Sequence, residues 1–75
     1  MAGQLPILSG KQVSKAFEDG GWNFARQRGS HMILIKEGSM VTLSVPEHKE
    51  VARGTLRSLI RAAGLTVDEF LALLS

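Results

Sequence analysis

The chain has 75 residues, no cysteine and a formal net charge of +2 at pH 7. This length allows one small domain, and the lack of cysteine excludes a disulfide framework and any thiolate metal site. A hydrophobic fraction of 44% with 21% charged residues is too apolar for a disordered segment. One Trp, three Phe and no Tyr are too few rings for an aromatic platform that stacks single-stranded bases.

The sequence gives no sign of membrane targeting. No apolar run approaches the roughly 20 residues that a membrane-spanning helix needs. The N-terminal residues lack a charged region and are too few for a signal peptide. We therefore expect no membrane contact, a cytoplasmic location, and a single domain over residues 1–75 whose residues 1–8 form a flexible N-terminal segment.

The first predicted element is a helix over about residues 10–20. Ser9 and Gln12 match the capping-box pattern that opens helices, and Gly20-Gly21 ends the pattern. Apolar residues recur between them at helical spacing: Val13, Ala16 and Phe17.

Three strands are predicted next, over about residues 22–28, 31–36 and 40–45. Trp22 and Phe24 are expected on one face of the first strand. Residues 37–39, Glu-Gly-Ser, predict the turn between the second and third strands. Proline cannot donate to a ladder, so we expect Pro46 to end the third strand and a loop to cover residues 46–54. The third strand alternates in hydrophobicity, with Val41, Leu43 and Val45 on its apolar side.

Two further helices are predicted. The second begins near Gly54-Thr55 and ends at Gly64, and the third begins with a capping box of Thr66 and Glu69. The apolar face of the second helix holds Leu56, Leu59, Ile60 and Ala63, and that of the third Val67, Phe70, Leu71 and Leu74. Helices that precede and follow a three-stranded antiparallel meander in the chain are expected to cover one sheet face, which predicts a two-layer α+β domain with the other sheet face open.

Residues 29–31, Gly-Ser-His, are the main candidate for chemistry. They follow a basic strand and lead into an apolar one, which predicts an imidazole at a turn beside Arg26 and Arg28. These two arginines share a strand face by parity. Such a place can hold a phosphodiester and move its protons. The alternative is a strand-edge histidine with one hydrogen bond, on an edge whose charges prevent aggregation.

Several segments together resemble the HicA family of toxins from type II toxin–antitoxin systems. They are residues 8–13 (Leu-Ser-Gly-Lys-Gln-Val), 21–22 (Gly-Trp), 26–31 (Arg-Gln-Arg-Gly-Ser-His), 45–48 (Val-Pro-Glu-His), 53–60 (Arg-Gly-Thr-Leu-Arg-Ser-Leu-Ile) and 63–65 (Ala-Gly-Leu). The resemblance implies a double-stranded-RNA-binding-domain-like fold, cleavage of mRNA and neutralisation by a HicB-like antitoxin. Many members have a second histidine after the motif histidine, where this chain has Met32.

With this resemblance, His31 is the expected catalytic residue of an endoribonuclease. RNA carries its own nucleophile, the 2′-OH, so the protein needs only a proton acceptor or donor. Imidazole is suited to this role because its unperturbed pKa is about 6.5. This mechanism, which we infer from the chemistry, needs no metal or cofactor, yields a 2′,3′-cyclic phosphate and does not cut DNA. We expect no DNA contact by this chain alone.

The other candidate residues have two interpretations each. Gly29 relieves a bulge or lets the backbone approach a phosphate, and Ser30 donates to a phosphate oxygen or solvates the turn. Arg53 and Arg57, with Arg61, form a basic stripe on the second helix that contacts RNA backbone or is simply solvated. His48 is expected to be a turn residue, and two histidines without cysteine do not predict a metal site.

Two non-catalytic functions compete with the toxin endoribonuclease. One is an RNA-binding module of the same fold, and the other is a scaffold that only binds a HicB-like protein. The His31 motif favours the enzyme, whereas the lack of a second obvious acid–base residue favours the modules.

Overall fold

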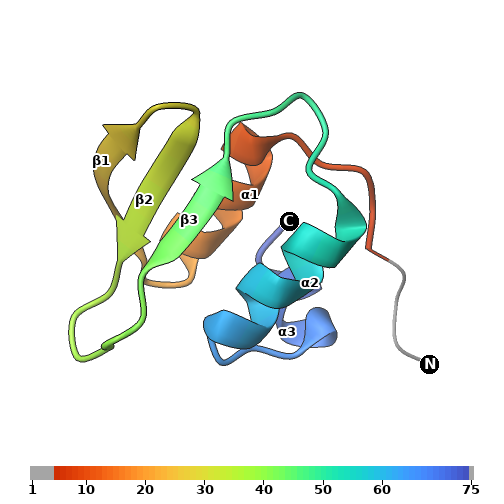
Figure 1. The fold of residues 1–75 in the computed structure, drawn as a ribbon. Helices are drawn as coiled ribbons and strands as arrows, with labels where there is room; N and C mark the ends of the chain where they lie inside the picture. The colour runs from red at the N-terminus through yellow and green to blue at the C-terminus, as the bar shows by residue number, and fades with distance from the viewer. Residues whose placement is uncertain (1–4, 75) are drawn as a thin grey trace.

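The computed structural model describes residues 5–74, which form three helices packed on one face of a sheet (Figure 1). In chain order the elements are α1 (Gly10–Asp19), β1 (Asn23–Arg28), β2 (His31–Ile35), β3 (Leu43–Pro46), α2 (Arg53–Ala62) and α3 (Val67–Ala72). The strands form an antiparallel sheet in the order β1-β2-β3. This confirms the α+β class and the α-β-β-β-α order followed by a short C-terminal helix.

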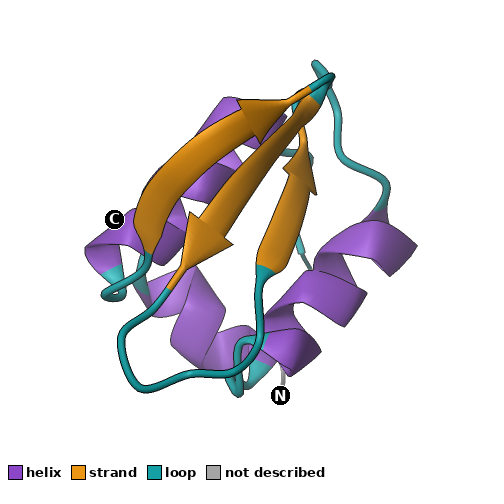
Figure 2. Cartoon of the chain, turned by 60° about the vertical axis from the view of Figure 1, so that its left-hand side comes forward, coloured by secondary structure: helices purple, strands orange, loops and turns teal. Residues whose placement is uncertain are grey.

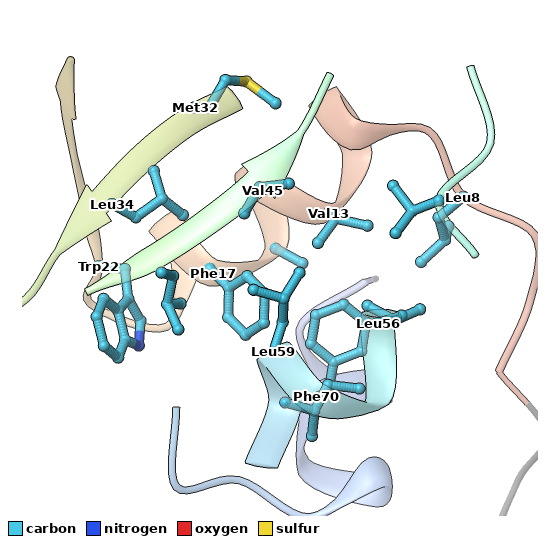
Figure 3. Packing of buried hydrophobic residues seen from close by; sticks show 14 of the residues in the cluster. Leu8, Val13, Phe17, Trp22, Met32, Leu34, Val45, Leu56, Leu59 and Phe70 are labelled. Atoms are coloured by element: carbon cyan, nitrogen blue, oxygen red, sulfur yellow. The ribbon is translucent and has the colours of Figure 1, made fainter. Parts of the chain in front are cut away.

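The sheet has one open face. Figure 2 shows the strands across the front of the molecule with no helix in front of them. On the other side, the core side chains of β2 and β3 meet those of the helices (Figure 3). Met32, Leu34, Leu43 and Val45 come from the sheet, and Val13, Phe17, Leu56, Leu59 and Phe70 from the helices. Because every second strand residue points to the same face, residues 31, 33 and 35 face the open side.

The helix ends follow the sequence signals closely. The Ser9 hydroxyl accepts from the Gln12 amide at 3.2 Å and the Gln12 side chain accepts from the Ser9 amide at 2.9 Å, and Thr66 and Glu69 repeat this box at α3. At the end of α2, Gly64 has a φ of +78°, and the Leu65 amide donates to the Ile60 carbonyl. This is the Schellman arrangement, and Gly20-Gly21 closes α1 in the same way.

The strands differ from the prediction at β1. Trp22 lies outside β1, because its amide donates to the Phe17 carbonyl in the closing turn of α1, and its ring is buried. Phe24 pairs with the helix-facing Leu34, yet it is 48% exposed because β1 is an edge strand. The register then shifts between Phe24 and Arg26, so Ala25 is an extra residue in a β-bulge.

The third strand begins later than predicted. The Ser39 amide closes a turn on the Lys36 carbonyl with Gly38 at a φ of +84°, and the Ser39 hydroxyl then accepts from the Val41 amide. This local bond occupies a donor that a strand at residues 40–42 would need, so β3 covers only Leu43–Pro46. Pro46 is the last residue of β3, and α2 begins at Arg53, which shortens the predicted loop at both ends.

Within the expected flexible segment over residues 1–8, the described residues 5–8 run along the packed domain. Leu5 and Leu8 are buried in the core, and the Val51 amide donates to the Leu8 carbonyl at 2.8 Å. Residues 1–4 lie outside the described residues. No helix within residues 5–74 has the length and apolar character needed to cross a membrane.

Candidate functional site

The candidate site begins with the turn between β1 and β2. Gly29 and Ser30 alone join Arg28 to its cross-strand partner His31. Gly29 has a φ of +59°, whereas Ser30 has no positive φ, which is the pattern of a type II′ hairpin turn. Gly29 therefore provides the positive φ that this turn requires. The interpretation that Gly29 relieves a bulge is wrong, because the bulge lies at Ala25.

His31 stands at the end of the open sheet face. It is exposed, and the register places it between Arg28 on β1 and Pro46 on β3. Directly paired residues of antiparallel strands project to the same face, so Arg28 and His31 share the open side. A histidine and an arginine are thus neighbours at one edge of a turn that is open to solvent.

Arg26 lies on the same face as this pair. It pairs with Ile33, which follows His31 by two residues. The bulge at Ala25 moves Arg26 and Arg28 together away from the side that Phe24 occupies. Of the apolar side chains on this face, Ile33 is only 5% exposed, whereas Ile35 is 47% exposed.

Met32 has a different environment from its neighbour His31. It is 7% exposed and packs in the core on the helix side of the sheet. A side chain at position 32 therefore points away from the open face. In this chain the open face carries a single histidine at the turn, and no adjacent histidine accompanies it.

Two polar side chains fasten the turn to the rest of the fold. The Gln27 side chain donates from Nε2 to the Gly29 carbonyl at 3.1 Å and to Oε1 of Glu47 at 2.9 Å. The Glu47 amide donates to the Ser30 carbonyl at 2.7 Å. The sequence assigned no role to Gln27, and no spacing rule could have joined it to a residue twenty positions away.

The β3–α2 loop and the start of α1 meet at the same end. The Gly10 amide donates to the His48 carbonyl at 2.9 Å, and a Cβ on Gly10 would overlap the Pro46 carbonyl. The exposed His48 side chain lines a shallow depression with Ser9, Lys11, Glu47 and Lys49. His31 is not part of this lining.

The arginines of α2 lie apart from the turn. Arg53, Arg57 and Arg61 are exposed, opposite the buried Leu56, Leu59 and Ile60. The helix packs beside β3, at the sheet edge remote from β1 (Figure 1). The three arginines therefore form an exposed basic stripe on α2, whereas Arg28 and His31 lie on β1 and β2. Within residues 5–74, no three His, Cys, Asp or Glu side chains form a group that could hold a metal ion.

Comparison with known families gives one match. The model of the HicA toxin of bacterial toxin–antitoxin systems matches residues 10–65, which run from α1 through α2 and include the Gly-Ser-His turn. The chain belongs to the HicA toxin family. A search of curated proteins finds no match to it. Membership makes this chain a HicA-type toxin of a toxin–antitoxin pair, and it supports an antitoxin as its partner.

Proposed function

We propose that this HicA-family chain is an endoribonuclease that cleaves mRNA, with His31 as its acid–base group. The observation that supports this most strongly is the position of His31. The imidazole stands exposed on the open sheet face, beside the guanidinium-bearing Arg28 and at the tip of a hairpin. An RNA backbone can reach such an edge without any rearrangement of the fold.

The chemistry requires little beyond proton transfer. The 2′-OH of the substrate attacks the adjacent phosphorus, a new O–P bond forms, and the bond from phosphorus to the 5′-oxygen breaks. His31 accepts the proton of the 2′-OH or donates a proton to the leaving 5′-oxygen, and solvent water completes the other of these two proton transfers. The products are a 2′,3′-cyclic phosphate and a 5′-hydroxyl. No step needs a metal, and a substrate without the 2′-OH is not cut.

The neighbouring basic side chains bind the phosphates of the RNA. Arg26 and Arg28 share the face of His31, so both can offer guanidinium donors to the phosphate that reacts or to the next one. Ser30 is exposed in the turn and offers a hydroxyl donor. Gly29 gives the turn its shape. Arg53 and Arg57 bind the backbone of the RNA farther along its path.

A HicB-like antitoxin is the proposed inhibitor. It binds over the open face, where His31 and the half-exposed Ile35 lie on one strand. A protein that buries this apolar side chain also covers the imidazole, so it excludes RNA by occupying the same space.

Induced expression tests the function in cells. Wild type and His31→Ala are expressed from the same promoter, and growth and the integrity of total RNA are followed. The wild type is expected to stop growth and degrade mRNA, whereas His31→Ala accumulates as a folded protein without effect. Equal toxicity and equal RNA loss from the two proteins would contradict the proposal.

A further inference from the structure

We propose that Gln27 and Glu47 are positioning residues that hold the Gly29-Ser30 turn, and with it His31, in the geometry that cleavage requires. This inference rests on the proposed function of His31. Gln27 and Glu47 together form what we term the turn clamp.

The turn clamp satisfies both carbonyl groups of the turn. One hydrogen of the Gln27 side-chain amide goes to the Gly29 carbonyl, at 3.1 Å, and the other to the Glu47 carboxylate, at 2.9 Å. The Ser30 carbonyl accepts from the Glu47 backbone at 2.7 Å. Carbonyls at the tip of a hairpin commonly face water, so two protein donors on adjacent carbonyls fix this tip more firmly than a turn alone would.

Glu47 is itself held by other segments. It follows Pro46, the cross-strand partner of His31, and its carboxylate lies 4.0 Å from the Lys11 ammonium on α1. Gly10, the first residue of α1, packs against Pro46 and Glu47 so closely that a Cβ would lie 2.9 Å from the Glu47 Cα. The clamp therefore ties the turn to β3 and α1, which are parts of the packed core.

The clamp lies on the opposite side of the sheet from the imidazole. Gln27 pairs with Met32, whose side chain is in the core, so Gln27 projects toward the helix side. RNA on the open face touches His31 without touching Gln27. Loss of the clamp should therefore lower kcat and leave KM nearly unchanged, because substrate contacts remain while the imidazole is misplaced.

Glu47 acts in the clamp as a hydrogen-bond acceptor, and its negative charge is not required. Its Oε1 receives the Gln27 amide, and a glutamine at position 47 could present a carbonyl oxygen in the same place. Its ion pair with Lys11 is long, and the Lys11 side chain is 79% exposed, so the charge contributes little. Glu47→Gln is thus the conservative variant that should rescue what Glu47→Ala loses.

The kinetic test uses purified full-length protein and a short RNA. We expect Gln27→Ala and Glu47→Ala each to lower kcat about 10- to 100-fold, as a displacement of about 1 Å does at a reacting group. The double variant should be no worse than either single one, and Glu47→Gln should stay within about threefold of wild type. Glu50→Ala is the matched control, since it removes an exposed carboxylate from the same loop and should change nothing.

Four results would overturn the proposal. Equal losses in Glu47→Gln and Glu47→Ala would assign the effect to charge. Multiplying losses in the double variant would show two independent roles. A rise in KM at constant kcat would make the pair a substrate contact. Failure of Gln27→Ala to fold, measured by circular dichroism, would also contradict a role confined to the turn.

A measurement without RNA separates this inference from the proposed function. Backbone NMR order parameters of Gly29 and Ser30 should fall from about 0.85 toward 0.6 in Gln27→Ala and stay high in Glu47→Gln. Unchanged values in Gln27→Ala would refute the clamp. If the clamp behaves as expected but wild type cuts no RNA, the function of His31 is wrong and the turn clamp still stands.

Discussion

Arg28 and His31 face each other across the end of the β1–β2 hairpin, joined only by Gly29 and Ser30. The turn therefore sets the distance between a cation and an imidazole, and Gln27 and Glu47 hold the turn in place. The third side of the site, Pro46 on β3, comes from a different part of the chain. Cleavage by His31 depends on this small assembly.

Gly29→Ala should impair cleavage more than stability. The φ of +59° is costly for alanine, by about 1–2 kcal/mol, although a Cβ there would meet no atom within 4 Å. The strain should shift the turn and lower kcat/KM. Gly64→Ala is the control, because it has a φ of +78° in equally open space but lies at the end of α2. Denaturant unfolding should show similar losses for both variants, and equal cleavage by both would contradict a role for the turn.

Arg53 and Arg57 should contribute to RNA affinity without sequence preference. Each lost phosphate contact lowers the slope of log affinity against log salt by about 0.7 for single-stranded RNA. The double variant Arg53→Ala/Arg57→Ala should therefore bind more weakly and with a flatter slope. Arg61→Ala, which removes the same charge from the last turn of α2, should have a smaller effect. An unchanged slope in the double variant would mean that the stripe is only solvated.

Cleavage should not depend on a divalent metal. The proposed mechanism moves protons through His31 and uses the 2′-OH of the RNA, so excess EDTA should leave the rate unchanged. The assay compares initial rates with EDTA and with added magnesium. Loss of activity in EDTA that magnesium restores would instead point to carboxylates such as Glu37 or Glu47.

The antitoxin should compete directly with RNA. A partner over the open face would protect the amides of residues 29–36 from hydrogen exchange and displace a bound RNA. A non-cleavable RNA and the purified cognate antitoxin provide the competition experiment. A ternary complex with no added protection at these amides would show that inhibition acts from a distance.

Local signals in the sequence predicted local structure well. The capping boxes at Ser9 and Thr66 and the glycine stop at Gly64 lie where the pattern placed them, because each depends on contacts within a few residues. The start of β3 was predicted too early, since apolar alternation cannot show that the Ser39 hydroxyl captures the Val41 amide.

The candidate site was predictable in part. One local segment contains Arg26, Arg28 and His31. The two arginines lie on the same sheet face, as predicted, because the bulge at Ala25 precedes both of them. Strand parity alone would have placed Phe24 with them. The link between Gln27 and Glu47 could not be read from the sequence, because it depends on how β3 and α1 meet the turn.

Cleavage of a defined RNA by purified protein tests the central claim most directly. Wild type and His31→Ala are compared on one RNA and on the same strand with 2′-deoxy sugars, and the product ends are identified by mass spectrometry. We predict that wild type cuts only the RNA and leaves a 2′,3′-cyclic phosphate, and that a folded His31→Ala is slower by about 10²- to 10⁴-fold. Cleavage by His31→Ala at a rate near that of wild type, or cleavage of the 2′-deoxy strand, would contradict the account.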